Sequence, residues 1–453
     1  MSRSSGVAGW VSAAVRRLSS VAHPTSEASI RLRSPILPIA LLVFLGWELA
    51  LPGPFATAGI AFTASLLVIG FVWTREMASY VTTRRILRFT ALQVGDHLRE
   101  TLILENRSRW PVAYAAFVDQ STLPGHAIDG VRAGASRATR QWPFQVVCRQ
   151  RGVFTLGCWD VFLGDPFGIF EARQRYREPE MITVYPLLAD LPPGATRHRT
   201  LGDRSVLRQA LRAETVSAMT TRPYRPGDSL RHIHWRTTAR RDELFVRVFD
   251  PEALSATWLI LDLDEAVHVG SGAESSFEKM IMAAATLAAS LLDQGVPVGL
   301  VLEGEIARIV PPQYSRDGLW TILHALALIS PGRIPLASAL DRAATVVTIR
   351  DSVAILTPSL DPEWVRRLPA MAGRDAARQE VWLFDPASFG GSGAAEGLAQ
   401  WLRRQGTPTL VLRRDDIRAA AGSVARVRRT EPWPTAAQGA MRIAPLSPRL
   451  PAG

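Results

Sequence analysis

Lysine is almost absent from this 453-residue chain. Lys279 is the only one, so the formal net charge of +11 comes from arginine. A protein that binds nucleic acid usually presents a basic helix or a basic stripe with aromatic residues between the charges. No such stretch accompanies the arginines, so the sequence predicts no nucleic-acid partner.

Cysteine is also scarce, with Cys148 and Cys158 as the only two. Two cysteines are too few for a disulfide framework in a chain of this length, which favours a reducing compartment. We interpret both as small buried residues in neighbouring strands.

The chain lacks the motifs of common cofactor sites. The glycine-rich stretch at residues 390–393 has no Lys-Ser/Thr after it, so it is not a phosphate-binding loop. His23, His97 and His126 are isolated and lack metal-ligand spacing. We therefore expect no cofactor, and any ATP-driven work would come from a partner.

Two long apolar runs stand near the N-terminus. Pro35–Leu51 contains a single charge, Glu48, and Phe55–Trp73 contains none. About 20 apolar residues span a bilayer core, and the Pro-Gly-Pro between the runs breaks a helix. Residues 35–73 are predicted to form a two-helix transmembrane hairpin, the alternative being a hydrophobic hairpin buried in a soluble core.

Arginines flank the hairpin on both sides, whereas its turn is uncharged. By the positive-inside rule both flanks are cytoplasmic, including the N-terminal segment 1–34. The sequence thus predicts a multi-pass protein of the cytoplasmic membrane, with the lipid bilayer as a partner and its soluble domains in the cytoplasm. The flanking residues are Arg16, Arg17, Arg31, Arg33, Arg75, Arg84, Arg85 and Arg88.

The remaining chain is long enough for more than one domain. Residues 84–200 show short alternating runs with turn residues between them, which is typical of a β-sandwich. The expected strands are Leu98–Leu104, Val112–Val118, Trp142–Cys148, Val153–Leu156 and Ile182–Tyr185.

Residues 255–416 alternate between strand and helix patterns. Apolar positions three and four apart predict a helix at Phe277–Leu292, with others at Trp320–Ile329 and Gly397–Arg404. This alternation indicates a doubly wound α/β domain, and residues 417–453 are predicted to be a disordered tail. The expected strands are Trp258–Leu263, Val298–Leu302, Val353–Leu356, Val381–Phe384 and Thr409–Leu412.

The junction between these domains, residues 201–254, carries the densest polar motif. One interpretation is a buried network that locks the domains together. Others are binding of an anionic ligand or an acidic partner through arginine forks, and catalysis. The motif residues are Tyr224, Gly227, Asp228, Arg231, His232, His234, Trp235, Arg236 and Arg240.

The segment YRPGDSLRHIHWRTTARRDELFVRVFDPE, from Tyr224, resembles the hallmark of a bacterial family, domain of unknown function 58. RGVFTLG at 151–157 and DPFGIF at 165–170 are similar to a second signature of that family, and the paired apolar segments match its layout. The resemblance covers about residues 36–416. It implies a von Willebrand factor A-like α/β domain and pairing with a MoxR-type AAA+ ATPase.

Domains of the von Willebrand factor A type often hold Mg²⁺ through an Asp-x-Ser-x-Ser loop. Here Asp262 matches the first position, but Asp264 and Ala266 replace the two serines. Pro358 stands where a further ligand Asp would be expected. The usual metal site is therefore predicted to be lost, although Asp262 and Asp264 remain candidates for holding a cation.

These patterns together predict a non-enzymatic, membrane-anchored protein-interaction or scaffold protein in an envelope-related or chaperone-like system. The alternative is a membrane-associated enzyme or anion-binding protein that uses the junction motif. In that alternative Asp228, His232 or His234 would act as acid-base groups.

Overall fold

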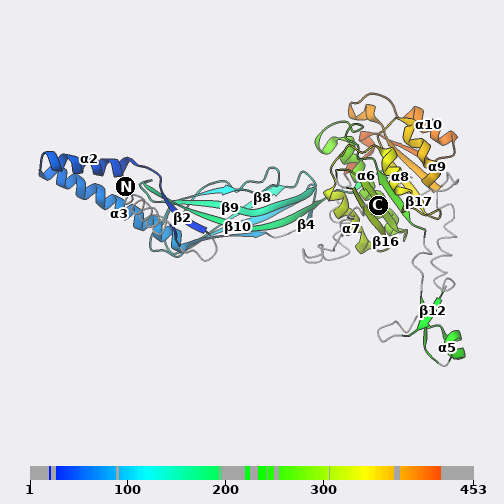
Figure 1. Ribbon diagram of the computed structural model, residues 1–453, viewed down its shortest axis with the longest axis horizontal. Helices are drawn as coiled ribbons and strands as arrows, with labels where there is room; N and C mark the ends of the chain where they lie inside the picture. The colour runs from blue at the N-terminus through cyan, green and yellow to red at the C-terminus, as the bar shows by residue number, and fades with distance from the viewer. Residues whose placement is uncertain are drawn as a thin grey trace, which may run out of the picture. The chain divides into compact units, whose positions relative to one another are not determined.

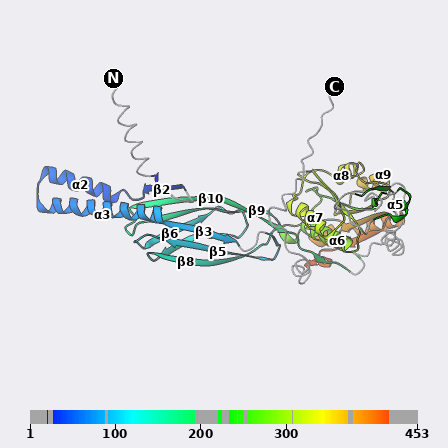
Figure 2. The ribbon, with the colours of Figure 1, turned by 90° about the horizontal axis from the view of Figure 1, so that it is seen from below.

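The computed structural model describes most of the chain, and its described residues divide into two compact units. The first ends at Val184 and the second begins at Tyr185. The first contains a helical hairpin and a β-sandwich, and the second contains an α/β domain and a β-hairpin element (Figures 1 and 2). The described residues are 20–21, 27–87, 91–192, 195, 220–224, 233–241, 243–248, 255–305, 307–371 and 378–419.

Two helices form the hairpin at one end of the sandwich (Figure 1). They are α2 (Ile36–Ala50) and α3 (Pro54–Tyr80), and they pack against each other. Their approach is close at Gly59, where an added Cβ would lie 2.6 Å from the Phe44 ring. Within the described residues, α3 alone is long and apolar enough to cross a membrane, and α2 is shorter.

Helix α3 runs directly into strand β3 (Val81–Leu87) with no loop between them. Met77, Ala78 and Val81 are fully buried at this junction. The last carbonyls of a helix have no partner inside the helix. Gln174 supplies one, because its Nε2 donates to the carbonyls of Ala78, at 3.2 Å, and Val81, at 2.9 Å.

Two sheets make up the sandwich, and both are described by their strand order. The smaller sheet has the order β3, β5 (His97–Asn106), β8 (Ala138–Val147). The larger sheet has the order β1 (Ser20–Val21), β2 (Glu27–Leu32), β10 (Phe170–Tyr185), β9 (Gly152–Gly164), β6 (Val112–Asp119), β7 (Gly130–Gly134). A further short strand, β4 (Ala91–Gln93), also pairs with β10.

The sandwich core lies between the two sheets and against the end of α3. Leu102 and Leu104 of β5 meet Phe117 of β6 and Val161 of β9 there, all at most 2% exposed. Buried and more exposed side chains alternate along β5, as in the strands of other sandwiches. The sequence located β5 and β6, whereas β9 and β10 are much longer than predicted and β3 was not predicted.

Several boundaries in this unit differ from those predicted. Glu27–Leu32, assigned above to a separate N-terminal segment, is a strand that pairs with β10. Helix α3 continues to Tyr80, past the predicted end of the hairpin at residue 73. The reason is that the last two turns of α3 bury their apolar side chains in the sandwich instead of ending at a polar boundary.

The second unit is built on a six-stranded sheet of order β16-β15-β14-β17-β18-β19. The five parallel strands are β15, β14, β17, β18 and β19. The sixth strand, β16, pairs antiparallel with β15 at the edge of the sheet. Their bounds are β14 (Thr257–Leu261), β15 (Val298–Glu303), β16 (Ala307–Gln313), β17 (Ser352–Thr357), β18 (Gln379–Phe384) and β19 (Thr409–Leu412).

Helices cover both faces of this sheet, which confirms the predicted doubly wound arrangement. Helices α8 (Leu336–Ala343) and α10 (Glu396–Arg404) pack on one face, and α6 (Ser276–Asp293) with α7 (Arg316–Leu328) on the other. A short helix, α9 (Leu368–Met371), follows β17. Every residue of β14 is buried, as expected for a strand covered on both faces.

The predicted tail begins slightly too early. Ile417 is fully buried, and β20 (Arg418–Ala419) pairs with β11 (Ala189–Asp190). The single lysine of the chain holds this segment, because Lys279 Nζ donates to the Ile417 carbonyl at 3.0 Å and lies 3.1 Å from Glu274 Oε1. Residues 420–453 lie outside the described residues.

We predict that Gly157→Ala destabilises the sandwich more than Gly95→Ala. Both glycines have a left-handed φ, which costs about 1–2 kcal/mol for a residue with a Cβ. A Cβ at Gly157 would also lie 2.5 Å from the Glu178 carbonyl oxygen, whereas nothing lies within 4 Å at Gly95. Urea unfolding should show an additional loss of about 1–3 kcal/mol for Gly157→Ala. Equal losses would contradict this account of the β9–β10 pairing.

Candidate functional site

The described part of the junction motif folds as a small hairpin element. Strand β12 (Thr220–Pro223) pairs antiparallel with β13 (Phe245–Val248), and helix α5 (Trp235–Arg241) lies between them in sequence. Ile233, Phe245 and Val246 form its buried apolar contacts, each about 5% exposed. The His234 amide donates to the Phe245 carbonyl at 2.8 Å, which ties the start of α5 to β13.

His234 has a structural role at the start of α5. Its Nδ1 accepts a hydrogen bond from the Thr237 amide at 3.2 Å, and the Thr237 hydroxyl oxygen lies 2.7 Å from the same nitrogen. A side chain that accepts from an amide in the first turn stabilises a helix start. Because Nδ1 is occupied as an acceptor, only Nε2 of His234 is left for another partner.

The rest of α5 presents a cationic and aromatic surface. Trp235 is 67% exposed, and Arg236, Arg240 and Arg241 are exposed as well. Arg241 also lies over the Phe245 ring, 5.3 Å from its centroid. We call the four side chains Trp235, Arg236, Arg240 and Arg241 the α5 surface.

The other motif residues that the structure describes differ in their exposure within this element. The arginines predicted to be paired in a buried network include Arg236 and Arg240, and both reach solvent. Tyr224 is partly buried, and its amide donates to the Leu244 carbonyl at 2.8 Å. Gly227, Asp228, Arg231 and His232 lie outside the described residues, so their predicted roles stay predictions.

A second polar site lies at the carboxyl edge of the parallel sheet, between β14 and β17. This is the point where the strand order reverses, and open α/β sheets bind ligands at such points. Asp262 follows β14 and is 1% exposed. The hydroxyl of Thr357, the last residue of β17, donates to Asp262 Oδ2 at 2.6 Å. The Asp264 amide donates to Oδ1 at 3.2 Å.

Burial decides the charge of Asp262. Removal from water raises the pKa of its carboxyl group to about 6, although the hydrogen bonds from Thr357 and Asp264 act in the opposite direction. The neighbouring negative charge of Asp264 makes a smaller contribution to this increase. Asp262 is therefore a carboxyl group whose protonation changes close to neutral pH.

His268 lies beside Asp262 as a neutral imidazole. Its Nε2 is 2.8 Å from the Asp262 carbonyl and donates to it, while Nδ1 lies 3.1 Å from the Ser276 hydroxyl. Ser276 Oγ in turn accepts from the Val269 amide at 2.8 Å. Burial lowers the pKa of His268 to about 4, so the ring supports the loop as an uncharged group.

The donor set at this edge does not fit an Mg²⁺ ion. Mg²⁺ prefers near-octahedral oxygen coordination, but Ala266 and Pro358 contribute no side-chain oxygen, and both Asp262 oxygens already accept hydrogen bonds. Asp264 Oδ1 accepts from the Ala266 amide at 3.1 Å. The described residues also contain no group of three metal-binding side chains.

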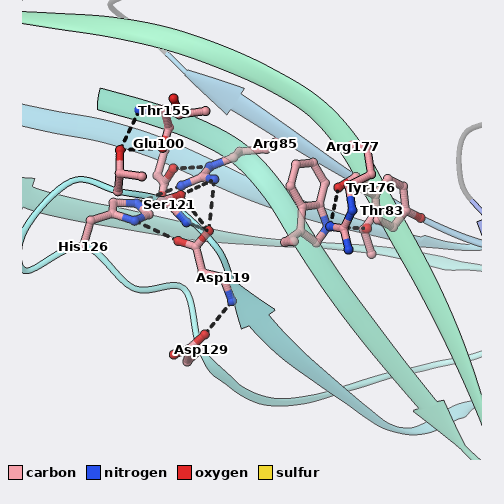
Figure 3. A network of polar contacts seen from close by, with 12 residues as sticks. Thr83, Arg85, Glu100, Asp119, Ser121, His126, Asp129, Thr155, Tyr176 and Arg177 are labelled. Carbon is pink, nitrogen blue, oxygen red and sulfur yellow. Dashed lines mark hydrogen bonds and ion pairs between the residues drawn. The ribbon is translucent and has the colours of Figure 1, made fainter. Parts of the chain in front are cut away.

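A third polar cluster is buried inside the sandwich (Figure 3). Arg85 Nε lies 2.5 Å from Glu100 Oε2, and its Nη1 lies 3.5 Å from Asp119 Oδ1. The His126 ring lies between the same two carboxylates, with Nε2 2.7 Å from Glu100 and Nδ1 2.8 Å from Asp119. All four side chains are 2–3% exposed.

These charges balance one another, which makes the cluster a structural element. Burial lowers the pKa of His126, but its close contacts with the carboxylates of Asp119 and Glu100 raise it to about 9. Burial raises the pKa values of both carboxyl groups, yet their bonds to His126 lower them on balance. Two cations and two anions therefore pair within one site that is almost completely buried.

Sequence reasoning missed this cluster because His126 is isolated along the chain. A usable signal was present in β5, where Glu100 occupies an inward position between Leu98 and Leu102. An acidic residue on an otherwise apolar face indicates a buried cationic partner. Thr357, His268 and Ser276 were also missed, since hydroxyl and imidazole groups far apart in sequence carry no spacing signal.

Comparison with known proteins supports the resemblance over part of the chain. Residues 220–388, from β12 past β18, match the family described as "Protein of unknown function DUF58". The uncharacterized protein YeaD of Bacillus subtilis is 22% identical over 275 residues, which are 59% of this chain and 67% of that protein. The uncharacterized protein Rv1480 of Mycobacterium tuberculosis is 27% identical over 220 residues, 46% of this chain and 69% of its own.

Two solved structures align with parts of this chain, both at low similarity. The sporulation control protein Spo0M from Bacillus subtilis aligns with 32% of this chain and 58% of its own, at 10% identity and a TM-score of 0.17. An alkylpurine DNA glycosylase, AlkC from Pseudomonas fluorescens, aligns with 30% of this chain and 42% of its own, at 16% identity and a TM-score of 0.14. Scores of this size assign neither a fold nor a function.

We predict that the free energy of unfolding of the Asp262→Asn variant increases relative to that of the parent as the pH rises from 4 to 7. A folded-state pKa raised from 3.8 to about 6 contributes stability that is complete below pH 3.8 and lost as the pH rises through 6. The parent should therefore lose about 3 kcal/mol of stability over this pH range. The variant should not lose it, because the Asn side chain does not titrate. The opposite effect of His268 is common to both proteins and cancels.

The measurement is urea unfolding of both proteins at several pH values. A difference between variant and parent that stays constant from pH 4 to pH 7 would contradict the raised pKa of Asp262. Any fixed cost of the amide substitution appears as an offset and does not affect the slope.

Proposed function

We propose that this protein is a membrane-anchored interaction protein that captures an acidic protein partner through the α5 surface. The observation that carries the proposal is an exposed tryptophan beside three exposed arginines on one short helix. Tryptophan and arginine are enriched among the few residues that carry most of the binding energy at protein interfaces. The described part of α5 has no acidic residue in its first turn to neutralise this charge.

The α/β domain is proposed to be von Willebrand factor A-like. The order of the strands across the sheet supports this. If β14 to β19 are numbered 1 to 6 along the chain, their spatial order is 3-2-1-4-5-6, and strand 3 is antiparallel. An aspartate directly after the first strand also agrees with that fold. The departures at Ala266 and Pro358 lead us to propose that the domain binds its partner without Mg²⁺.

The proposed partner is a MoxR-type AAA+ ATPase, as the family resemblance implies. The chain itself shows no phosphate-binding loop, so energy from ATP would have to be supplied by such a partner. In this arrangement the protein would act as a scaffold that localises the ATPase at the membrane, in an envelope-related or chaperone-like system.

The membrane anchor is proposed to consist of α2 and α3 together. Lipid is the solvent that suits the large apolar side chains these helices expose. The flanking arginines, by the positive-inside rule, support a cytoplasmic location for both ends and for the soluble units. The exposed side chains are Leu42 (67%), Leu49 (90%), Phe55 (87%), Phe62 (65%) and Val68 (62%).

An enzymatic or anion-binding use of the junction motif is the rival proposal. His234 gives it limited support, since Nδ1 already caps α5. The two proposals differ in what they require of Trp235, because an interface needs its exposed indole and an acid-base reaction at His234 does not.

We predict that Trp235→Ala combined with Arg240→Glu weakens capture of the MoxR-type ATPase of the same organism at least about tenfold. The indole supplies buried contact area, and the reversed charge repels an acidic surface. Binding of the full-length protein in lipid nanodiscs to the purified ATPase is the measurement. The matched control is Trp401→Ala with Arg404→Glu, because α10 exposes the same pair of residue types.

The control should bind like the parent, and thermal melts should show that both variants are folded. Equal binding by parent and α5 variant would contradict the proposed docking surface. Failure of the parent to bind would contradict the proposed partner.

A further inference from the structure

The sandwich end beside the hairpin carries an unusual set of side chains. Two chain segments form its rim, the turn Asp165–Phe170 and the loop Asn106–Pro111. Phe167 at the tip of the turn is 50% exposed, and Trp110 in the loop is 36% exposed. Both rings belong to the sandwich, whose other described aromatic side chains are buried or partly buried.

The turn is rigidly built and holds Phe167 outward. Asp165 is 1% exposed, and its Oδ1 accepts from the Phe167 amide at 2.7 Å. Its carboxylate also accepts from the amides of Ile169 and Phe170. The turn is joined to the start of the hairpin, because the Arg33 amide donates to the Ile169 carbonyl at 2.8 Å.

Helix α3 reaches this rim before it ends. A Cβ at Gly70 would lie 3.2 Å from Ile169, so the helix and the turn are in contact there. Phe71 then packs edge-on against Phe170, with ring centroids 5.6 Å apart. Trp73 lies 4.4 Å from Trp110 and donates through Nε1 to the Pro111 carbonyl at 3.2 Å.

The length of helix free of the sandwich is shorter than a bilayer. Pro54–Ile69 of α3 extends about 24 Å, and the 15 residues of α2 extend about 22 Å. The hydrocarbon core of a bilayer is about 30 Å thick. A helix that crosses it must therefore carry its Gly70–Trp73 turn to the membrane surface, and the rim of the sandwich with it.

The chemistry of the rim suits that position. Tryptophan and other amphipathic rings concentrate at the level of the lipid headgroups, and arginine accompanies them on the cytoplasmic side. Arg33 and Arg107 have side chains 54% and 65% exposed, and Arg75 and Arg109 are exposed as well. Arg107 and Arg109 lie in the same loop as Trp110, and Arg75 follows Trp73 on α3. Arg33 is joined through its amide to the turn that carries Phe167.

We infer that this rim is a lipid-binding surface, inserted in the headgroup layer of the membrane that α3 crosses. Phe167 and Trp110 lie among the glycerol and upper acyl groups, and the four arginines contact the phosphates of anionic lipids. The inference rests on the membrane anchoring proposed above. In this arrangement the sandwich contacts the bilayer surface directly, and no gap separates the two.

Spin-label accessibility in nanodiscs tests this position. Cys148→Ala and Cys158→Ser first remove the two native thiols, and single cysteines are then placed at Pro166, Leu42 and His97. Pro166 adjoins Phe167, Leu42 lies on α2, and exposed His97 begins β5 at the end of the sandwich away from Asn106. Nanodiscs of phosphatidylcholine and phosphatidylglycerol in equal parts supply anionic lipid.

The label at Pro166 should lose access to an aqueous nickel chelate relative to His97, and should gain access to oxygen. Adding Phe167→Ser should shift the Pro166 label back toward water, because the inserted ring is lost. Exchanging phosphatidylglycerol for phosphatidylcholine should have the same direction of effect, since the arginines lose their anionic contacts.

Leu42 separates failure of this inference from failure of the anchor. Its label should be inaccessible to the chelate if α2 lies in the membrane. A lipid-protected Leu42 with Pro166 as accessible as His97 would overturn the seated rim and leave the anchor standing. An aqueous Leu42 would overturn both.

Discussion

The two hydrogen bonds from Gln174 to the carbonyls of Ala78 and Val81 fix the joint on which the first unit depends. They satisfy helix-end carbonyls at a position where no water reaches, so α3 can enter the sandwich core without a loop. Tyr176 OH donates to Gln174 and accepts from the Thr83 amide, at 3.1 and 3.0 Å. Trp159 stacks on Tyr176 and donates to the Thr83 hydroxyl at 3.1 Å. We therefore expect the helix and the sandwich to move as one rigid body.

Charged side chains are buried and paired in the sandwich but exposed on α5, and this difference supports the proposed function. Inside the sandwich, Arg85 and His126 are matched by Glu100 and Asp119, so burial leaves no charge uncompensated. On α5 the arginines reach solvent around an exposed tryptophan, an arrangement that contributes little to folding. Aromatic residues and arginine are the side chains enriched at protein interfaces, so this composition suits a binding surface.

The sequence indicated the regular elements better than their connections. Alternation located the core of β5 and β6, and helical spacing located α6, because each buries one face whatever its neighbours are. Strand β2 escaped prediction because its pairing with β10 spans more than a hundred residues and leaves no local pattern. At the carboxyl edge, Asp262 was recognised from a motif, whereas its contact with Thr357 depends on strands β14 and β17 being neighbours. No spacing rule supplies that information.

The most direct test of the rigid joint is the distance distribution between spin labels at Val68 on α3 and Met181 on β10, measured by double electron–electron resonance in nanodiscs. Both side chains are exposed, at 62% and 66%, so labels are accommodated without disturbing the core. A single narrow distribution is the result that a continuous α3–β3 joint predicts. A broad or bimodal distribution would show a hinge at Tyr80 and contradict it.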